Sequence, residues 1–278
     1  MFTTIGNQVW AFDCEWIPDA RAGRILHKLP PAAPDEEVLK AMWLAGGATE
    51  ENPTPFLKYI LCRVVSIAVL IRKQTENGPA LKLFYLPDDP DNPAAREERQ
   101  IVGRFLSGVG KQKPQLVGYN SRGSDWRILL QRAVTLGISA KELCKRPVKP
   151  WEGYDYFSHA SEAHIDLQEC LAPSGFRNTP SLNELCALSG IPGKFETHGE
   201  EVFTLWQNGQ YRSIVEYNCF DAISTYLLWL RTAHFAGLFD DNQYDDEQEL
   251  VREYLMELCE DPKTAFVERY LDEWGNLE

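Results

Sequence analysis

Apolar and polar positions in the first third of the chain predict strands. Residues 8–12 form a short apolar run, and residues 61–71 and 81–86 are rich in β-branched and aromatic side chains. The turn-forming sequence Asn77-Gly78-Pro79 separates the last two runs. The pattern therefore predicts a first strand at 8–12 and then two strands that pair as an antiparallel hairpin.

The apolar spacing lengthens to the helical period further along the chain. A helical pattern over 96–106 is followed by a short apolar strand at 115–119 and by a second helical pattern from about 124 to 136. The order strand, hairpin, helix, strand, helix predicts an α/β fold in which helices flank a mixed sheet.

Two Ser-x-x-Glu sequences match the capping box that opens helices. The first, Ser181 to Glu184, predicts a helix that stops near Gly190. The second, Ser213 to Glu216, predicts a long helix that reaches about His234.

The remaining segments suggest how the chain is divided. Residues 17–59 contain six prolines and one helix-like piece near 36–44, so we expect an insertion in a domain that spans 1–239. Residues 240–278 are acid-rich, with Val251, Tyr254, Leu255 and Leu258 at helical spacing, which predicts an acidic C-terminal tail that packs a helix on the protein.

Composition narrows the class of protein. The net charge of the 278 residues is −13, but residues 240–278 alone carry 14 acidic residues against three basic ones. The rest of the chain is therefore nearly neutral, and its charge is compatible with a nucleic-acid partner. Seven cysteines without a Cys-x-x-Cys pair indicate reduced thiols rather than disulfides or a zinc site. No long apolar run or signal-peptide pattern is present, so we expect a cytoplasmic protein with no membrane partner.

Four carboxylates and one phenol stand out against this background. Asp13 and Glu15 come at the predicted end of the first strand, two residues apart and so on one face. Asp125 begins a predicted helix, and Tyr217 and Asp221 lie one turn apart on another. Taken singly, each has an ordinary explanation as a surface acid, a helix N-terminal acid or a core aromatic residue. Taken together, four carboxylates can hold two divalent ions about 4 Å apart, and Mg²⁺ or Mn²⁺ suits such oxygen ligands.

These motifs resemble those of the DEDD 3′→5′ exonucleases of the RNase H-like superfamily, in the tyrosine form, DEDDy. Among them, the chain is most similar to predicted exonucleases related to the proofreading domain of family-B DNA polymerases. The resemblance covers about residues 8–236. It rests on the carboxylate motifs and on the following further segments: Arg63–Ala68, His164–Leu167, Ser181–Leu185 and Gly190–Lys194.

The resemblance implies an RNase H-like fold with a five-stranded mixed sheet and a two-metal site. Asp13, Glu15, Asp125 and Asp221 would ligate two Mg²⁺ or Mn²⁺ ions, and Tyr217 would orient the attacking water. The implied activity is 3′→5′ hydrolysis of single-stranded or frayed DNA ends to nucleoside 5′-monophosphates. The chain departs from the family at Trp16 and Ser124, where small and aromatic residues respectively are usual.

Other features leave alternatives open. Asp166 is expected to cap a helix rather than ligate metal, and Asn120 either fixes its loop or contacts the substrate. Basic residues over 141–149 run into aromatic residues over 151–157, a pattern that also suits strand binding. An exoribonuclease, a non-catalytic binding module and a protein partner for the acidic tail remain alternatives to a DNA exonuclease.

Overall fold

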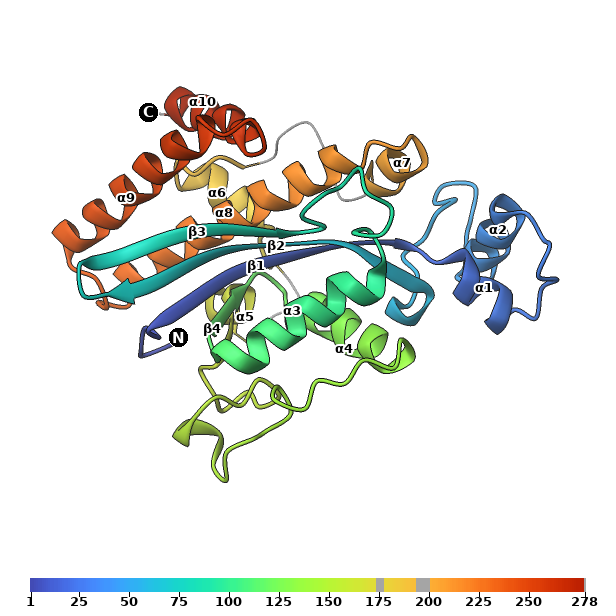
Figure 1. Cartoon of the computed structure of the whole chain (residues 1–278), viewed down its shortest axis with the longest axis horizontal. Helices are drawn as coiled ribbons and strands as arrows, with labels where there is room; N and C mark the ends of the chain where they lie inside the picture. The colour runs from blue at the N-terminus through green and yellow to red at the C-terminus, as the bar shows by residue number, and fades with distance from the viewer. Residues whose placement is uncertain (174–177, 194–200, 278) are drawn as a thin grey trace.

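The fold is built on a twisted mixed sheet, shown in Figure 1 in a computed structural model of the chain. The structure describes residues 1–173, 178–193 and 201–277. In that part of the chain, five strands pair in the order β3-β2-β1-β4-β5. The strands are β1 (Gln8–Pro18), β2 (Cys62–Thr75), β3 (Gly78–Leu86), β4 (Gln115–Gly118) and β5 (His164–Asp166). Strands β1, β2 and β3 pair antiparallel, and β4 pairs parallel with both β1 and β5. The predicted α/β, RNase H-like fold with a five-stranded mixed sheet is confirmed.

Helices cover both faces of the sheet (Figure 1). On one face α8 crosses the strands and carries α9 and α10, and on the other lie α3 and α4. The helices are α1 (Ala20–Leu26), α2 (Asp35–Ala45), α3 (Glu98–Gln112), α4 (Asp125–Thr135), α5 (Leu167–Leu171), α6 (Leu182–Leu188), α7 (Val202–Gln207), α8 (Tyr211–Phe235), α9 (Asp241–Cys259) and α10 (Glu268–Asn276), with short 3-10 turns at Tyr59–Leu61, Pro150–Glu152 and Ala265–Val267. Every helix in these described ranges is too short or too polar to traverse a lipid bilayer.

Several predicted elements are confirmed, and three differ. The hairpin of β2 and β3 and the capping box of Ser181 with Glu184 are present as expected. The first strand does not end at Asp13 and Glu15: it continues to Pro18, because its pairing with β2 extends that far. Helix α8 begins at Tyr211, so the predicted cap at Ser213 is wrong and that serine lies within the first turn. Strand β5 was not predicted as a strand, since three residues are too few for a periodic pattern.

The segment that the proline pattern marked as an insertion contains two helices instead of one. Helix α1 starts at Asp19, whose carboxylate caps it and also accepts a hydrogen bond from Arg132 of α4 at 2.8 Å. Gly23 lets α1 approach α2 closely, since a Cβ there would lie 2.3 Å from the sulfur of Met42. Tertiary contacts therefore order the polar, proline-rich segment.

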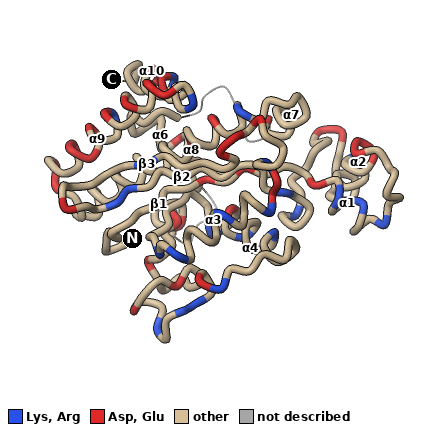
Figure 2. Tube along the Cα trace, in the orientation of Figure 1, with Lys and Arg blue, Asp and Glu red and all other residues tan. Residues whose placement is uncertain are grey.

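The acidic C-terminal residues fold onto the face of the sheet that α8 covers. Asp and Glu recur along α9 (Figure 2), yet the helix inserts Val251 and Leu255 into the core beside α8. Glu247 accepts hydrogen bonds from the buried Arg72 of β2 at 3.0 Å and from Tyr226 of α8 at 3.2 Å. The expected helix is present, and an ion pair within the core helps to fix it.

Candidate metal centre

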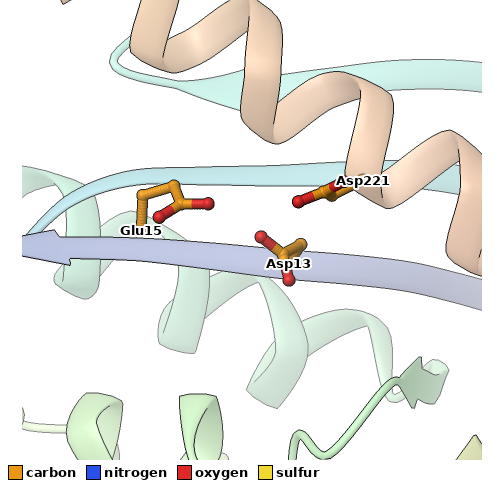
Figure 3. A group of neighbouring side chains, drawn as sticks. All are labelled: Asp13, Glu15 and Asp221. Carbon is orange, nitrogen blue, oxygen red and sulfur yellow. The ribbon is translucent and has the colours of Figure 1, made fainter. Parts of the chain in front are cut away.

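Three of the five candidate residues converge between β1 and α8. Asp13 and Glu15 leave the same face of β1, and Asp221 on α8 points at them from above (Figure 3). Each offers a carboxylate oxygen, and the three oxygens lie within 4.8 Å of one another. Residues more than 200 positions apart in the sequence thus form one acidic cluster.

Asp125 lies beside this cluster at the first turn of α4. It is 4% exposed and is not in the group whose oxygens all lie within 4.8 Å, but its charge raises the pKa of both Asp13 and Glu15. The Ser124 hydroxyl donates to its carboxylate at 2.6 Å. Ser124, one of the two departures from the resemblance, therefore holds this carboxylate in place.

Within the protein, the negative charges of these carboxylates are unfavourable. Burial, followed by the charges of Asp125, Glu15 and Asp221, raises the pKa of Asp13 well above its ordinary value. Burial and the charge of Asp221 do the same for Glu15, and burial raises the pKa of Asp125 to about 7. A buried carboxylate needs a cation or several donors to stay ionised. The donor set is all oxygen and strongly anionic, so it fits hard divalent cations such as Mg²⁺ or Mn²⁺.

Tyr217 lies one helical turn before Asp221, as the sequence predicts. Its phenol lies close enough to the Asp221 carboxylate for the two groups to interact. Burial and the charges of Asp221, Glu15 and Asp13 raise the pKa of the phenol. The tyrosine is therefore a neutral hydroxyl near the carboxylate cluster.

Asn218, next to Tyr217 on α8, is a site residue that the sequence analysis did not identify. It is completely buried, its amide donates to Asp13 at 2.6 Å, and its carbonyl oxygen accepts from Ser66 at 3.1 Å. Ser66 lies on β2 opposite Glu15. Asn218 thus links α8, β1 and β2 and fixes Asp13. Its position next to Tyr217 was the only signal in the sequence.

The loop before Asp125 is held by hydrogen bonds to Asp166, the last residue of β5. Asp166 caps α5 and also accepts from the backbone amides of Asn120 at 2.9 Å and Arg122 at 2.8 Å. This confirms the capping interpretation of Asp166. Asn120 adopts a left-handed backbone, φ 54°, and its side chain is exposed, so its backbone rather than a buried amide shapes the loop.

The basic and aromatic stretch over 141–157 is partly open to solvent. Trp151 and Tyr154 are exposed, whereas Tyr156 is fully buried against Trp126 and Arg146 pairs with Asp155 at 2.9 Å. Strand binding by this stretch stays a prediction. Lys194, the last residue of the glycine-rich turn in the resemblance, lies outside the described residues.

Part of the chain is similar in sequence to parts of DNA polymerases. The chain is 28% identical over 119 residues to DNA polymerase 2 of Aeropyrum pernix, covering 42% of this chain and 14% of that protein. It is 26% identical over 144 residues to the catalytic subunit of DNA polymerase epsilon from Emericella nidulans, covering 49% of this chain and 6% of that protein. The chain thus spans only a small part of these curated relatives.

A solved structure and a family model extend the comparison. The family B DNA polymerase of Pyrobaculum calidifontis superposes with a TM-score of 0.48 at 19% identity, over 81% of this chain and 24% of that one. The model of predicted 3′-5′ exonucleases related to the exonuclease domain of PolB matches residues 54–274, a range that includes Asp125, Tyr217 and Asp221 and begins after Asp13 and Glu15. Since the match covers well over half of the chain, the protein belongs to this family of predicted 3′-5′ exonucleases related to the exonuclease domain of PolB.

Proposed function

We propose that the chain is a metal-dependent 3′→5′ exonuclease that hydrolyses single-stranded or frayed DNA ends to nucleoside 5′-monophosphates. The observation that carries the proposal is the cluster of Asp13, Glu15 and Asp221, whose oxygens lie within 4.8 Å of one another. Asp125 borders it and shares its unfavourable charge. Family membership supplies the reaction class.

The four carboxylates would hold two divalent ions, Mg²⁺ or Mn²⁺. When bound, such ions lower the pKa of the attacking water and stabilise charge on the leaving oxygen. Asn218 keeps Asp13 in one orientation, and Ser124 does the same for Asp125. The Tyr217 phenol, next to Asp221, would accept a hydrogen bond from the attacking water or donate one to it, and this bond would orient the water.

DNA is preferred to RNA as the substrate class because the matched relatives are named as DNA polymerases. An exoribonuclease would use the same carboxylates, since the 2′-hydroxyl is recognised by neighbouring groups. We also retain the proposal that the acidic surface of α9 binds a protein partner. Its buried side chains serve the core, so a partner would contact its exposed acids.

A time course with 5′-labelled single-stranded DNA and a matched RNA, in Mn²⁺, Mg²⁺ or EDTA, tests the proposal. We expect one substrate to shorten from its 3′ end in the presence of either ion and to stay intact in EDTA. Asp13→Ala and Asp221→Ala should each abolish cleavage while leaving the circular dichroism spectrum unchanged. Failure of the folded wild-type protein to cleave either substrate would favour the non-catalytic binding module instead.

A further inference from the structure

Two arginines stack on one indole close to the carboxylate cluster. We call Arg63, Arg96, Trp206 and Tyr211 the arginine–indole cluster. The guanidinium carbons of Arg63 and Arg96 lie 5.3 Å and 5.9 Å from the centroid of the Trp206 ring, and that of Arg96 lies 3.6 Å from the centroid of Tyr211. The two rings meet edge to face, with centroids 4.8 Å apart. Three segments of the chain thus bring two positive charges to one indole ring.

These two charges are not neutralised by the protein. In residues 1–173, 178–193 and 201–277, neither arginine forms an ion pair with a carboxylate, whereas Arg72, Arg132 and Arg146 all do. The Nε atoms of Arg63 and Arg96 are buried and have no hydrogen-bond partner, while each arginine as a whole is partly exposed. Two like charges held together are unfavourable unless an anion joins them. In a chain of net charge −13, this local excess of positive charge is notable because acids are abundant elsewhere.

The cluster lies on the same side of the sheet as the metal centre. Arg63 pairs with Ile17 in the ladder of β1 and β2, two residues beyond Glu15, which corresponds to about 7 Å along the strand. Ile17 packs against α7 and α8 in a group that also contacts Tyr217 and Trp206. Tyr211 precedes Tyr217 by six residues of helix α8, or about 9 Å. The backbone positions of the two groups are thus about 7–9 Å apart along neighbouring elements, so the arginines can form a separate contact for the strand.

We propose that the arginine–indole cluster binds a backbone phosphate of the substrate strand, upstream of the linkage that is cut. The inference rests on the proposed exonuclease function and deepens it by assigning a second anchor for the strand. Guanidinium groups match phosphate oxygens in a forked geometry, and stacking on aromatic faces holds them in place before the ligand arrives. The phosphate supplies the counter-charge that the protein lacks at this position.

Binding as a function of salt tests the proposal. The Asp221→Ala protein is used because we expect it not to degrade the strand. It is titrated into fluorescein-labelled oligothymidylate, and so is the same protein that also carries Arg63→Gln and Arg96→Gln. We expect the pair to weaken binding about tenfold to a hundredfold. The slope of log K against log salt should fall by about 0.7 for each phosphate that the protein no longer binds. Arg104 is an exposed arginine with a terminal nitrogen 3.0 Å from the Asp88 carboxylate. Arg104→Gln is the matched control and should change neither the affinity nor the slope.

A neutral methylphosphonate at each of the first four linkages from the 3′ end then locates the phosphate that the cluster binds. At one linkage it should weaken binding of the Asp221→Ala protein but not of the protein that also carries both arginine changes. An unchanged salt slope, equal losses in both proteins at every linkage, or binding too weak to measure at low salt would overturn the phosphate site. Cleavage by the wild-type chain is measured alongside: linkage-specific losses without cleavage would refute the exonuclease and leave the phosphate site standing.

Discussion

Replacement of Asn218 by alanine should weaken metal binding, although Asn218 is not one of the four carboxylates expected to hold the metal ions. The change removes a donor 2.6 Å from the Asp13 carboxylate and the acceptor for Ser66 at 3.1 Å. With Mn²⁺ bound and Asp13 ionised, the bond to its carboxylate is worth about 1.5–3 kcal/mol and the neutral one about 1 kcal/mol, so we expect the free energy of unfolding in Mn²⁺ to fall by about 2–4 kcal/mol. The Asn218 donor also lowers the pKa of Asp13, so its loss favours the proton over a metal ion.

Metal dependence separates this role from simple packing. Loss of a residue that orients a metal ligand commonly costs about 10- to 100-fold in metal affinity or activity. The half-saturating Mn²⁺ concentration for cleavage should therefore rise by about that factor in Asn218→Ala. Thr232 is a buried residue on the same helix, and its hydroxyl donates to the Leu228 carbonyl; Thr232→Ala is therefore the control and should lose stability without changing the Mn²⁺ requirement. An Mn²⁺ requirement within about twofold of wild type in Asn218→Ala would refute the positioning role.

Three further changes probe the same structure. Tyr217→Phe should lower turnover while leaving the Mn²⁺ requirement nearly constant, because it removes only a hydroxyl; unchanged turnover in a single-turnover assay would exclude the phenol from the reaction. Glu247→Gln should lower the free energy of unfolding in urea by about 3–5 kcal/mol, because it leaves the Arg72 charge buried and unpaired, and Arg72→Met with Glu247→Leu should recover most of that loss. In EDTA, stability should fall as pH rises from about 4 to 7, because the folded protein holds the Asp125 proton to about pH 7, a contribution on the order of 4 kcal/mol. Mn²⁺ should therefore raise the melting temperature more at pH 8 than at pH 5.5. An equal rise at both pH values would contradict the raised pKa of Asp125.

Local geometry explains what the sequence predicts well. Alternation of side chains along a strand puts Asp13 and Glu15 on one face wherever the strand ends, and the helical period does the same for Tyr217 and Asp221. The Asn77-Gly78 turn joins β2 to β3, and the box of Ser181 with Glu184 opens α6. These features depend on residues within a few positions of one another, so they can be seen without a structure.

Features that depend on distant partners could not be predicted in this way. The first strand extends past Glu15 because β2 pairs with it to Pro18. Helix α8 starts before Ser213, at Tyr211, whose ring meets Trp206 edge to face and lies against the Arg96 guanidinium in the tertiary structure. A Ser-x-x-Glu pattern can occur inside a helix as well as at its start, and only contacts from other segments decide between the two.

The sequence by itself determined the class of fold, the order of the carboxylates and the face that each one occupies, since backbone periodicity sets these over short ranges. Tertiary structure alone decided that Asn218 holds Asp13, that Glu247 buries its charge against Arg72, and that two arginines meet on Trp206. The physical reason is the same in each case. A buried polar group must find its partner wherever the chain brings one, and those partners lie up to 205 residues away.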